Sequence, residues 1–191
     1  IDDFGFWYAQ VRANFGNFFG YGSAFLQANY TGNDAGKTYN LVNVAEGLAN
    51  PDNTLTKQQL IEQETFIDKS KRYNIEFQNN FDIIETNIFT WGVQYTNTQP
   101  NSEGTFLSDG PTGNPIKLND VGVYLQYENE MVRNFGFFGS ARYDYNDVFG
   151  GRVSPKIGLA FKPKNHNIRL AYNEAFGSPP IQPAFAQTFI T

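Results

Sequence analysis

The sequence predicts an all-β protein, a transmembrane antiparallel β-barrel of which these 191 residues supply about eight strands. Three observations predict this fold class. Apolar and polar residues alternate in eight windows, and the connections between the windows switch between short and long. Aromatic residues make up 17% of a chain whose mean hydropathy is only −0.46. A wall of strands with one apolar face and one polar face explains this combination of many rings and low mean hydropathy.

The windows alternate at period two, as expected of strands whose successive side chains point to opposite faces of a sheet. With frayed ends, most windows reach about 9–11 residues, the length of a tilted strand that crosses a bilayer. No segment is apolar enough for a membrane helix, because the longest early stretch without charge, residues 13–33, contains four glycines. The windows are residues 7–15, 24–30, 73–81, 87–96, 121–127, 135–145, 153–161 and 168–172.

In the first four windows, apolar and polar residues occupy opposite parities, although the alternation in residues 24–30 is weaker because Phe25 lies among the polar residues. The apolar series includes Trp7, Val11, Leu26, Phe77 and Trp91, and the polar series includes Arg12, Gln27, Glu76 and Gln94.

The last four windows repeat the pattern with more charge. Their apolar series includes Val123, Tyr143, Leu159 and Leu170, and their polar series includes Gln126, Arg142, Asp144, Lys156 and Arg169.

The charged residues of the windows all take the polar parity, and we expect them to face the barrel lumen. These candidates are Arg12, Glu76, Arg142, Asp144, Lys156 and Arg169. They could pair as ions across adjacent strands or line a substrate path. The opposite parity is expected to face lipid, with the candidates Trp7, Val11, Phe77, Trp91, Leu159 and Leu170. Aromatic residues near the ends of windows, such as Tyr73 and Phe81, fit the headgroup level of a membrane.

The connections are expected to alternate strictly in length, which places the tight turns at one end of an antiparallel sheet and the long loops at the other. Outer-membrane barrels have this arrangement, whereas a soluble sandwich mixes its loop lengths. The expected connections are short around 16–17, long over 31–70, short at 85–86, long over 97–119, short at 133–134, moderate over 146–151 and tight over 163–167, with a further long loop opening at Gly177.

The longest loop carries a capping box, Thr56 to Gln59, which predicts a helix that extends to about Phe66. Such a helix could contact substrate or keep a long loop compact, and the sequence favours the second interpretation. Tyr39 and Phe106 are loop candidates for ligand contact, although no spacing singles them out. Gly20 and Gly22 are expected on a strand, where they would mark a bend or a close approach.

The composition excludes several chemistries. The absence of cysteine excludes a disulfide scaffold, a thiolate metal site and a cysteine nucleophile. The one histidine, His166, lies in a predicted exposed turn. A single histidine cannot form a histidine metal cluster, and one in an exposed turn is poorly placed for a catalytic triad. A net charge of −5 argues against a nucleic-acid partner that is held through its phosphates. We therefore expect no enzyme, no cofactor and no metal.

Three motifs in the last third of the chain follow one another on the predicted strands. They are residues 141–144 (Ala-Arg-Tyr-Asp), residues 153–159 (Val-Ser-Pro-Lys-Ile-Gly-Leu) and residues 169–179, which end in Ala-Phe-Gly-Ser-Pro. Their order resembles the barrel of TonB-dependent outer-membrane receptors. The family usually has Arg after the Phe of the third motif, where this chain has Gly177.

The resemblance implies active uptake across the bacterial outer membrane through a barrel of about 22 strands. It also implies a separate plug domain, TonB acting through that plug, and a small nutrient such as a siderophore, cobalamin, a glycan or a peptide. Residues 1–191 would then be a part of the barrel, with the plug and the remaining strands outside the sequence. The charged polar series would pair or contact the plug rather than bind substrate.

Two other interpretations stay open on the residues alone. One is a complete eight-stranded outer-membrane barrel with a structural or adhesion role, and the other is a soluble β-sandwich that binds a ligand.

Overall fold

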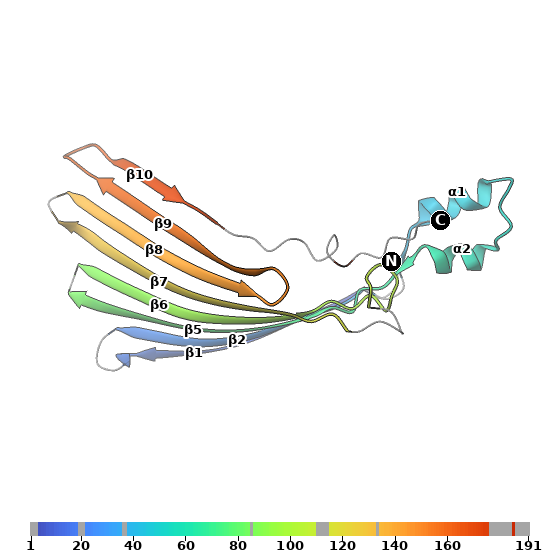
Figure 1. Ribbon diagram of the computed structural model, residues 1–191, viewed down its shortest axis with the longest axis horizontal. Coiled ribbons are helices and arrows are strands. Elements are labelled where there is room, and N and C mark those ends of the chain that lie inside the picture. Colours follow the sequence, from blue (N-terminus) through green and yellow to red (C-terminus); the bar gives the residue numbers. More distant parts are fainter. Residues whose placement is uncertain are drawn as a thin grey trace.

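A computed structural model describes residues 4–18, 22–35, 38–84, 86–109, 115–132, 134–175 and 185. The eight expected windows all lie within strands of one antiparallel sheet, in the order β1-β2-β5-β6-β7-β8-β9-β10 (Figure 1). The strands are β1 (Gly5–Gly16), β2 (Ser23–Asp34), β5 (Lys71–Ile84), β6 (Asn87–Gln99), β7 (Leu118–Val132), β8 (Phe135–Asn146), β9 (Gly150–Phe161) and β10 (Ile168–Asn173). The predicted antiparallel fold is therefore confirmed.

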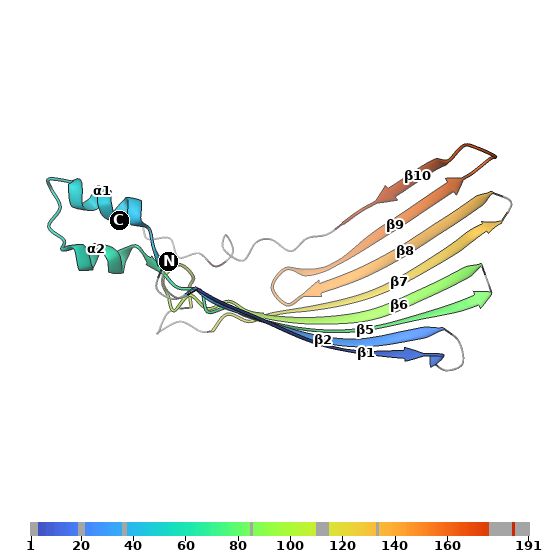
Figure 2. The ribbon, with the colours of Figure 1, turned by 180° about the vertical axis from the view of Figure 1, so that it is seen from behind.

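The sheet is curved and open (Figures 1 and 2). Each neighbouring pair is antiparallel, and within the described part of the chain β1 pairs with β2 alone and β10 with β9 alone. A complete eight-stranded barrel would pair its first and last strands, and a sandwich would pack two sheets face to face. The described strands do neither of these.

The connection between β2 and β5 is an excursion at one end of the sheet (Figure 1). It contains β3 (Thr38–Tyr39), α1 (Leu41–Ala49), α2 (Lys57–Gln63) and β4 (Thr65–Phe66), and β3 pairs with β4. The two helices pack against each other, with Leu60 of α2 close to Gly47 of α1, and both Val44 and Leu60 are buried.

The capping box on α2 is confirmed, because the Thr56 side chain accepts from the Gln59 backbone N–H and the Gln59 side chain accepts from the Thr56 backbone N–H. The predicted end of this helix at about Phe66 is wrong: α2 ends at Gln63 because Thr65 and Phe66 pair with β3. The helix α1 was not predicted, although Asn40 caps it by accepting hydrogen bonds from two backbone N–H groups, those of Val42 and Asn43.

The connections that follow β1, β5, β7 and β9 lie at one end of the sheet, and the excursion lies at the other, together with the connections that follow β6 and β8 (Figure 1). The expected strict alternation of lengths is wrong at one position, because β8 and β9 are joined by residues 147–149 alone. The Asn146 side chain accepts from the backbone N–H groups of Val148 and Phe149, and Gly150 takes a positive φ of 79°. These features close a tight turn where we expected a moderate loop.

The described residues contain no helix that is both long and apolar enough to cross a membrane, a finding that does not bear on crossing by strands.

Candidate functional site

The six charged candidates lie on one face of the sheet, here called the polar face. One row of cross-strand neighbours runs through Arg12, Gln27, Glu76, Gln94, Gly122 and Asp144. Arg142 shares this face because it lies two residues from Asp144 on β8. Lys156 pairs with Asn173, and Arg169 lies on the Asn173 parity of β10, so both belong to the same face.

The six apolar candidates lie on the opposite face, here called the apolar face. One of its rows runs through Val11, Ala28, Ile75, Tyr95, Val121 and Tyr145. Phe77 pairs with Leu26 and Val93 on this face, and Leu159 pairs with Leu170. The register thus separates the two candidate sets as the sequence parity predicted.

The two faces differ in exposure, and the difference is opposite to that of a soluble sheet. On β7, Val123 is 41% exposed and Leu125 is 50% exposed, whereas Gly122 between Val121 and Val123 on the polar parity is buried. On β8, Tyr143 is 48% exposed, whereas Arg142 and Asp144 are half-buried. On these central strands the polar side chains are the more crowded ones, whereas the candidates of the outer strands, Arg12, Lys156 and Arg169, are exposed.

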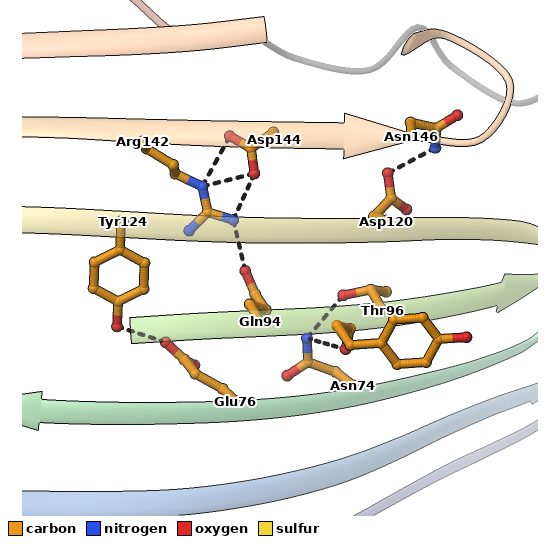
Figure 3. A network of polar contacts seen from close by, with 10 residues as sticks. Asn74, Glu76, Gln94, Thr96, Asp120, Tyr124, Arg142, Asp144 and Asn146 are labelled. Atoms are coloured by element: carbon orange, nitrogen blue, oxygen red, sulfur yellow. Dashed lines mark hydrogen bonds and ion pairs between the residues drawn. The ribbon is translucent and has the colours of Figure 1, made fainter. Parts of the chain in front are cut away.

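The centre of the polar face is a network of polar side chains (Figure 3). The Arg142 Nε donates to both carboxylate oxygens of Asp144 at 2.7 and 2.9 Å, and its Nη2 donates to Gln94 Oε1 at 2.8 Å. The Tyr124 hydroxyl lies 2.7 Å from Gln78 Oε1 and 3.2 Å from Glu76 Oε1. These contacts join β5, β6, β7 and β8 across the sheet.

Two glycines make room for this network. A Cβ on Gly122 would lie 2.3 Å from Arg142 Nη2, and a Cβ on Gly92 would lie 2.4 Å from the ring of Tyr124. Arg142 and Tyr124 can therefore lie flat across the neighbouring strands. We did not single out these glycines from the sequence, although both interrupt the polar parity of a strand, which is the signal that could have found them.

Pairing across adjacent strands was one alternative for the charged residues, and Arg142 and Asp144 instead pair within β8. Among the described residues, Arg12, Lys156 and Arg169 form no ion pair. The guanidinium of Arg12 lies 3.8 Å from the ring centre of Phe25, and the ammonium of Lys156 lies 6.0 Å from that of Phe138.

A hollow of 280 Å³ on the polar face brings together Glu76, Tyr124, Arg142 and Lys156. Arg169 is not part of it and lines a second hollow with Glu128. The four residues around the first hollow supply a carboxylate, a hydroxyl and two cations from four different strands, a suitable surface for another polar protein segment.

The loop candidates have different surroundings. Phe106 packs against the small buried cluster of Leu107, Ile116 and Leu118. Tyr39 lies on β3 and is 38% exposed. His166 lies in the exposed turn between β9 and β10, as predicted.

The predicted strand position of the two glycines is wrong for Gly22, which lies just before β2 with a φ of 84°, against the Asn80 carbonyl. Gly20 and the motif residues 176–179 lie outside the described residues.

An antiparallel sheet with a crowded polar face and an exposed apolar face defines a wall segment of a membrane β-barrel. The sequence model of the family described as "TonB dependent receptor-like, beta-barrel" matches residues 2–191. The chain therefore belongs to the family of TonB-dependent receptor barrels, which places it in the bacterial outer membrane. The family is one of receptors rather than enzymes, in agreement with the sequence analysis.

Among solved structures, the chain is similar to the siderophore receptor PirA from Pseudomonas aeruginosa, with a TM-score of 0.62 and 14% sequence identity. The match covers 91% of this chain and 30% of that receptor, so the chain spans less than a third of the matched structure. At this identity the similarity shows the fold. No curated protein matches the chain.

Proposed function

We propose that the chain is part of the barrel wall of a receptor that takes up a small nutrient across the outer membrane with the help of TonB. The family and the coverage of about a third of PirA support this proposal. The ligand class is open among siderophores, cobalamin, glycans and peptides. The observation that carries the proposal is the reversed exposure of the two faces of the sheet.

The sheet needs further strands to serve as such a wall. In lipid, the backbone N–H and C=O groups of an unpaired edge strand have no water to bind, so a spanning sheet must close. The outer edges of β1 and β10 carry such groups, and no described strand pairs with them. Residues 1–191 are then one part of a barrel of about 22 strands, whose other strands pair with β1 and β10.

The apolar face contacts lipid, and the polar face lines the lumen. The proposed lipid contacts are Trp7, Val11, Phe77, Trp91, Leu159 and Leu170. Large exposed apolar side chains on a continuous face are costly in water and favourable in hydrocarbon. The connections that follow β1, β5, β7 and β9 then lie on the periplasmic side, and the excursion with α1 and α2 lies outside the cell, together with the tight turn between β8 and β9.

The network around Arg142 serves the plug of the receptor rather than its ligand. Its side chains are already committed to partners on neighbouring strands, so they form a fixed polar surface. A plug domain with complementary polar groups would dock on the hollow between Glu76 and Lys156. Ligand contact falls to the outer loops, where Tyr39 is exposed.

Uptake measurements in cells test this function. A strain that lacks the full-length gene should lose uptake of one of the four ligand classes, each supplied in labelled form, and a plasmid copy should restore it. A protonophore should abolish the same uptake, because TonB draws on the proton gradient. Unchanged uptake of all four classes, or uptake that is insensitive to the protonophore, would contradict the proposal.

A further inference from the structure

The apolar face changes character along β6 and β7 toward the end of the sheet that carries the excursion. The apolar pair Val93 and Val123 is followed on β6 by Tyr95, whose hydroxyl donates to Asn119 Oδ1 at 2.8 Å. The Asn97 side chain donates to the same oxygen at 2.9 Å. Hydrocarbon, then tyrosine, then amide is the order expected where a membrane passes from acyl chains to headgroups.

The next level on this face is basic. Lys71 pairs with Gln99 and lies on the parity of Tyr73, so it belongs to the apolar face. Lys117 directly precedes β7, on the parity of Asn119. Together with Lys69, these lysines line a hollow of 200 Å³ whose wall also includes the amide side chains of Gln99 and Asn101. The hollow is here called the lysine rim.

The charges around the lysine rim leave two ammonium groups available. Lys69 is held by Glu103, with 2.6 Å between Nζ and Oε1. Asp109 also lines the hollow, but its carboxylate already accepts from Ser102 and from the Gly104 backbone. Lys71 and Lys117 are exposed and form no ion pair with a described residue. The rim therefore offers a ligand two cations without an ion-pair partner among the described residues. The amide of Gln99 already donates to Asn97, and the Asn101 oxygen already accepts from the Glu103 backbone.

We propose that the lysine rim binds the phosphate-bearing headgroup of a lipid in the outer leaflet of the membrane. This inference rests on the proposed orientation, in which the apolar face meets lipid and the excursion lies outside the cell. Basic side chains at the headgroup level attract anionic lipids, and lysine binds phosphate as a compact point charge. The acyl chains of the bound lipid would lie along Tyr95, Val93 and Val121 below the rim.

Binding measurements on the full-length receptor in detergent test the inference. The probe is a bis-phosphorylated lipid A, and its binding is measured by native mass spectrometry at low ionic strength. The variant is the double substitution Lys71→Gln and Lys117→Gln. We expect the affinity for this lipid to fall about tenfold, because each lysine near the headgroup contributes to the attraction. Lipid A without its phosphates should bind the unaltered receptor as weakly as the variant binds the intact lipid.

The matched control is Arg72→Gln, which removes a cation from the adjacent residue of β5 on the other face of the sheet. This control should bind the lipid normally, and the pair Lys71→Arg and Lys117→Arg should restore most of the affinity. Equal losses in the control and the lysine variant would overturn the inference, as would normal binding by the lysine variant. Displacement of the lipid by equimolar inorganic phosphate would assign the rim to free phosphate instead and would also overturn it.

A spin label on a Val121→Cys variant separates this inference from the proposed function. A label in contact with lipid, combined with lysine variants that bind lipid A normally, overturns the lysine rim alone. A label in water overturns the proposed orientation and the lysine rim with it.

Discussion

The two faces of the sheet are built from the same strands but are stabilised in different ways. On the polar face, side chains bond to one another across strands, and Gly92 and Gly122 let Tyr124 and Arg142 lie flat. On the apolar face, large side chains stand exposed and aromatic rings pair along the rows. A soluble sheet hides its apolar side and hydrates its polar side. The reversed arrangement supports the proposal that the apolar side meets lipid rather than water.

The apolar face itself differs between its two ends. Toward the end formed by the β5–β6 and β7–β8 connections its rings are mostly phenylalanines, with 5.0 Å between the ring centres of Phe81 and Phe89, and Tyr127 is the exception that pairs with Phe89. Toward the excursion they are tyrosines, with 5.1 Å between those of Tyr30 and Tyr73. Tyrosine has an apolar ring and a polar hydroxyl, and it suits a level where lipid meets water.

The largest expected effect comes from placing a charge on each face of the same strand. Leu125→Arg should destabilise the folded receptor by about 2–4 kcal/mol, because it puts a cation at the middle of the lipid-facing side of β7. Gln126→Arg, one residue on, should be nearly neutral since it faces the lumen. Urea titration of the full-length receptor in lipid vesicles measures both free energies of unfolding. Equal costs for the two variants would remove the distinction between the faces.

The next effect tests how the polar face is packed. Gly122→Val should cost about 1–3 kcal/mol, because its side chain would occupy the space of the Arg142 guanidinium and break the contact with Gln94. Gly16→Val is the matched control, because a Cβ there would meet nothing within 4 Å. The same urea titration applies. A Gly122 variant as stable as the control would show that the network does not depend on this close approach.

A smaller effect is expected for ring packing on the apolar face. The rings of Phe135 and Phe161 are stacked, with 4.4 Å between their centres. Phe135→Leu keeps an apolar side chain but removes this stacking, and it should cost about 0.5–1.5 kcal/mol in the vesicle titration. Phe4→Leu, at an exposed site before β1, is the control and should change little. If Phe135→Leu lowers the free energy of unfolding no more than the control does, contact with lipid stabilises this site as well as contact with the Phe161 ring.

The smallest effect lies outside the wall, at Lys69 and Glu103. The hydrogen bond and the charge of Glu103 raise the pKa of Lys69 above its ordinary value of 10.5. The pair therefore contributes stability below pH 10.5 and loses it as the pH rises through the raised pKa. The stability difference between the unaltered receptor and Glu103→Gln should be slight at pH 8 and vanish above that pKa. A difference that grew with pH would contradict this assignment.

The strands and their faces could be predicted because period two reports directly on the side of a sheet that a residue occupies. Alternation along one strand is enough to place Arg142 and Tyr143 on opposite faces of the sheet, and likewise Gln126 and Leu125. This assignment needs no knowledge of the rest of the molecule. What the sequence did not reveal depends on local side-chain geometry. Asn146 closes the β8–β9 turn through its side chain, so the expected moderate loop is absent.

Partner choice was also beyond the sequence. Arg142 could reach a carboxylate on its own strand or on its neighbours, and the position of Asp144 two residues away favours the former. The flat positions of Tyr124 and Arg142 depend on Gly92 and Gly122, which come from adjacent strands and become neighbours of these side chains only in the folded register.

The central claim is that the apolar face meets lipid and the polar face meets water or plug. The 191 residues contain no cysteine, so single cysteines can be introduced along β7 without a background from this segment. Spin labels at successive positions from Val121 to Tyr127, in the full-length receptor in vesicles, report collisions with oxygen dissolved in lipid and with a water-soluble nickel complex. We predict high oxygen collision rates at the odd positions and low rates at the even ones. Oxygen and nickel collision rates without alternation, or with the opposite alternation, would contradict the account.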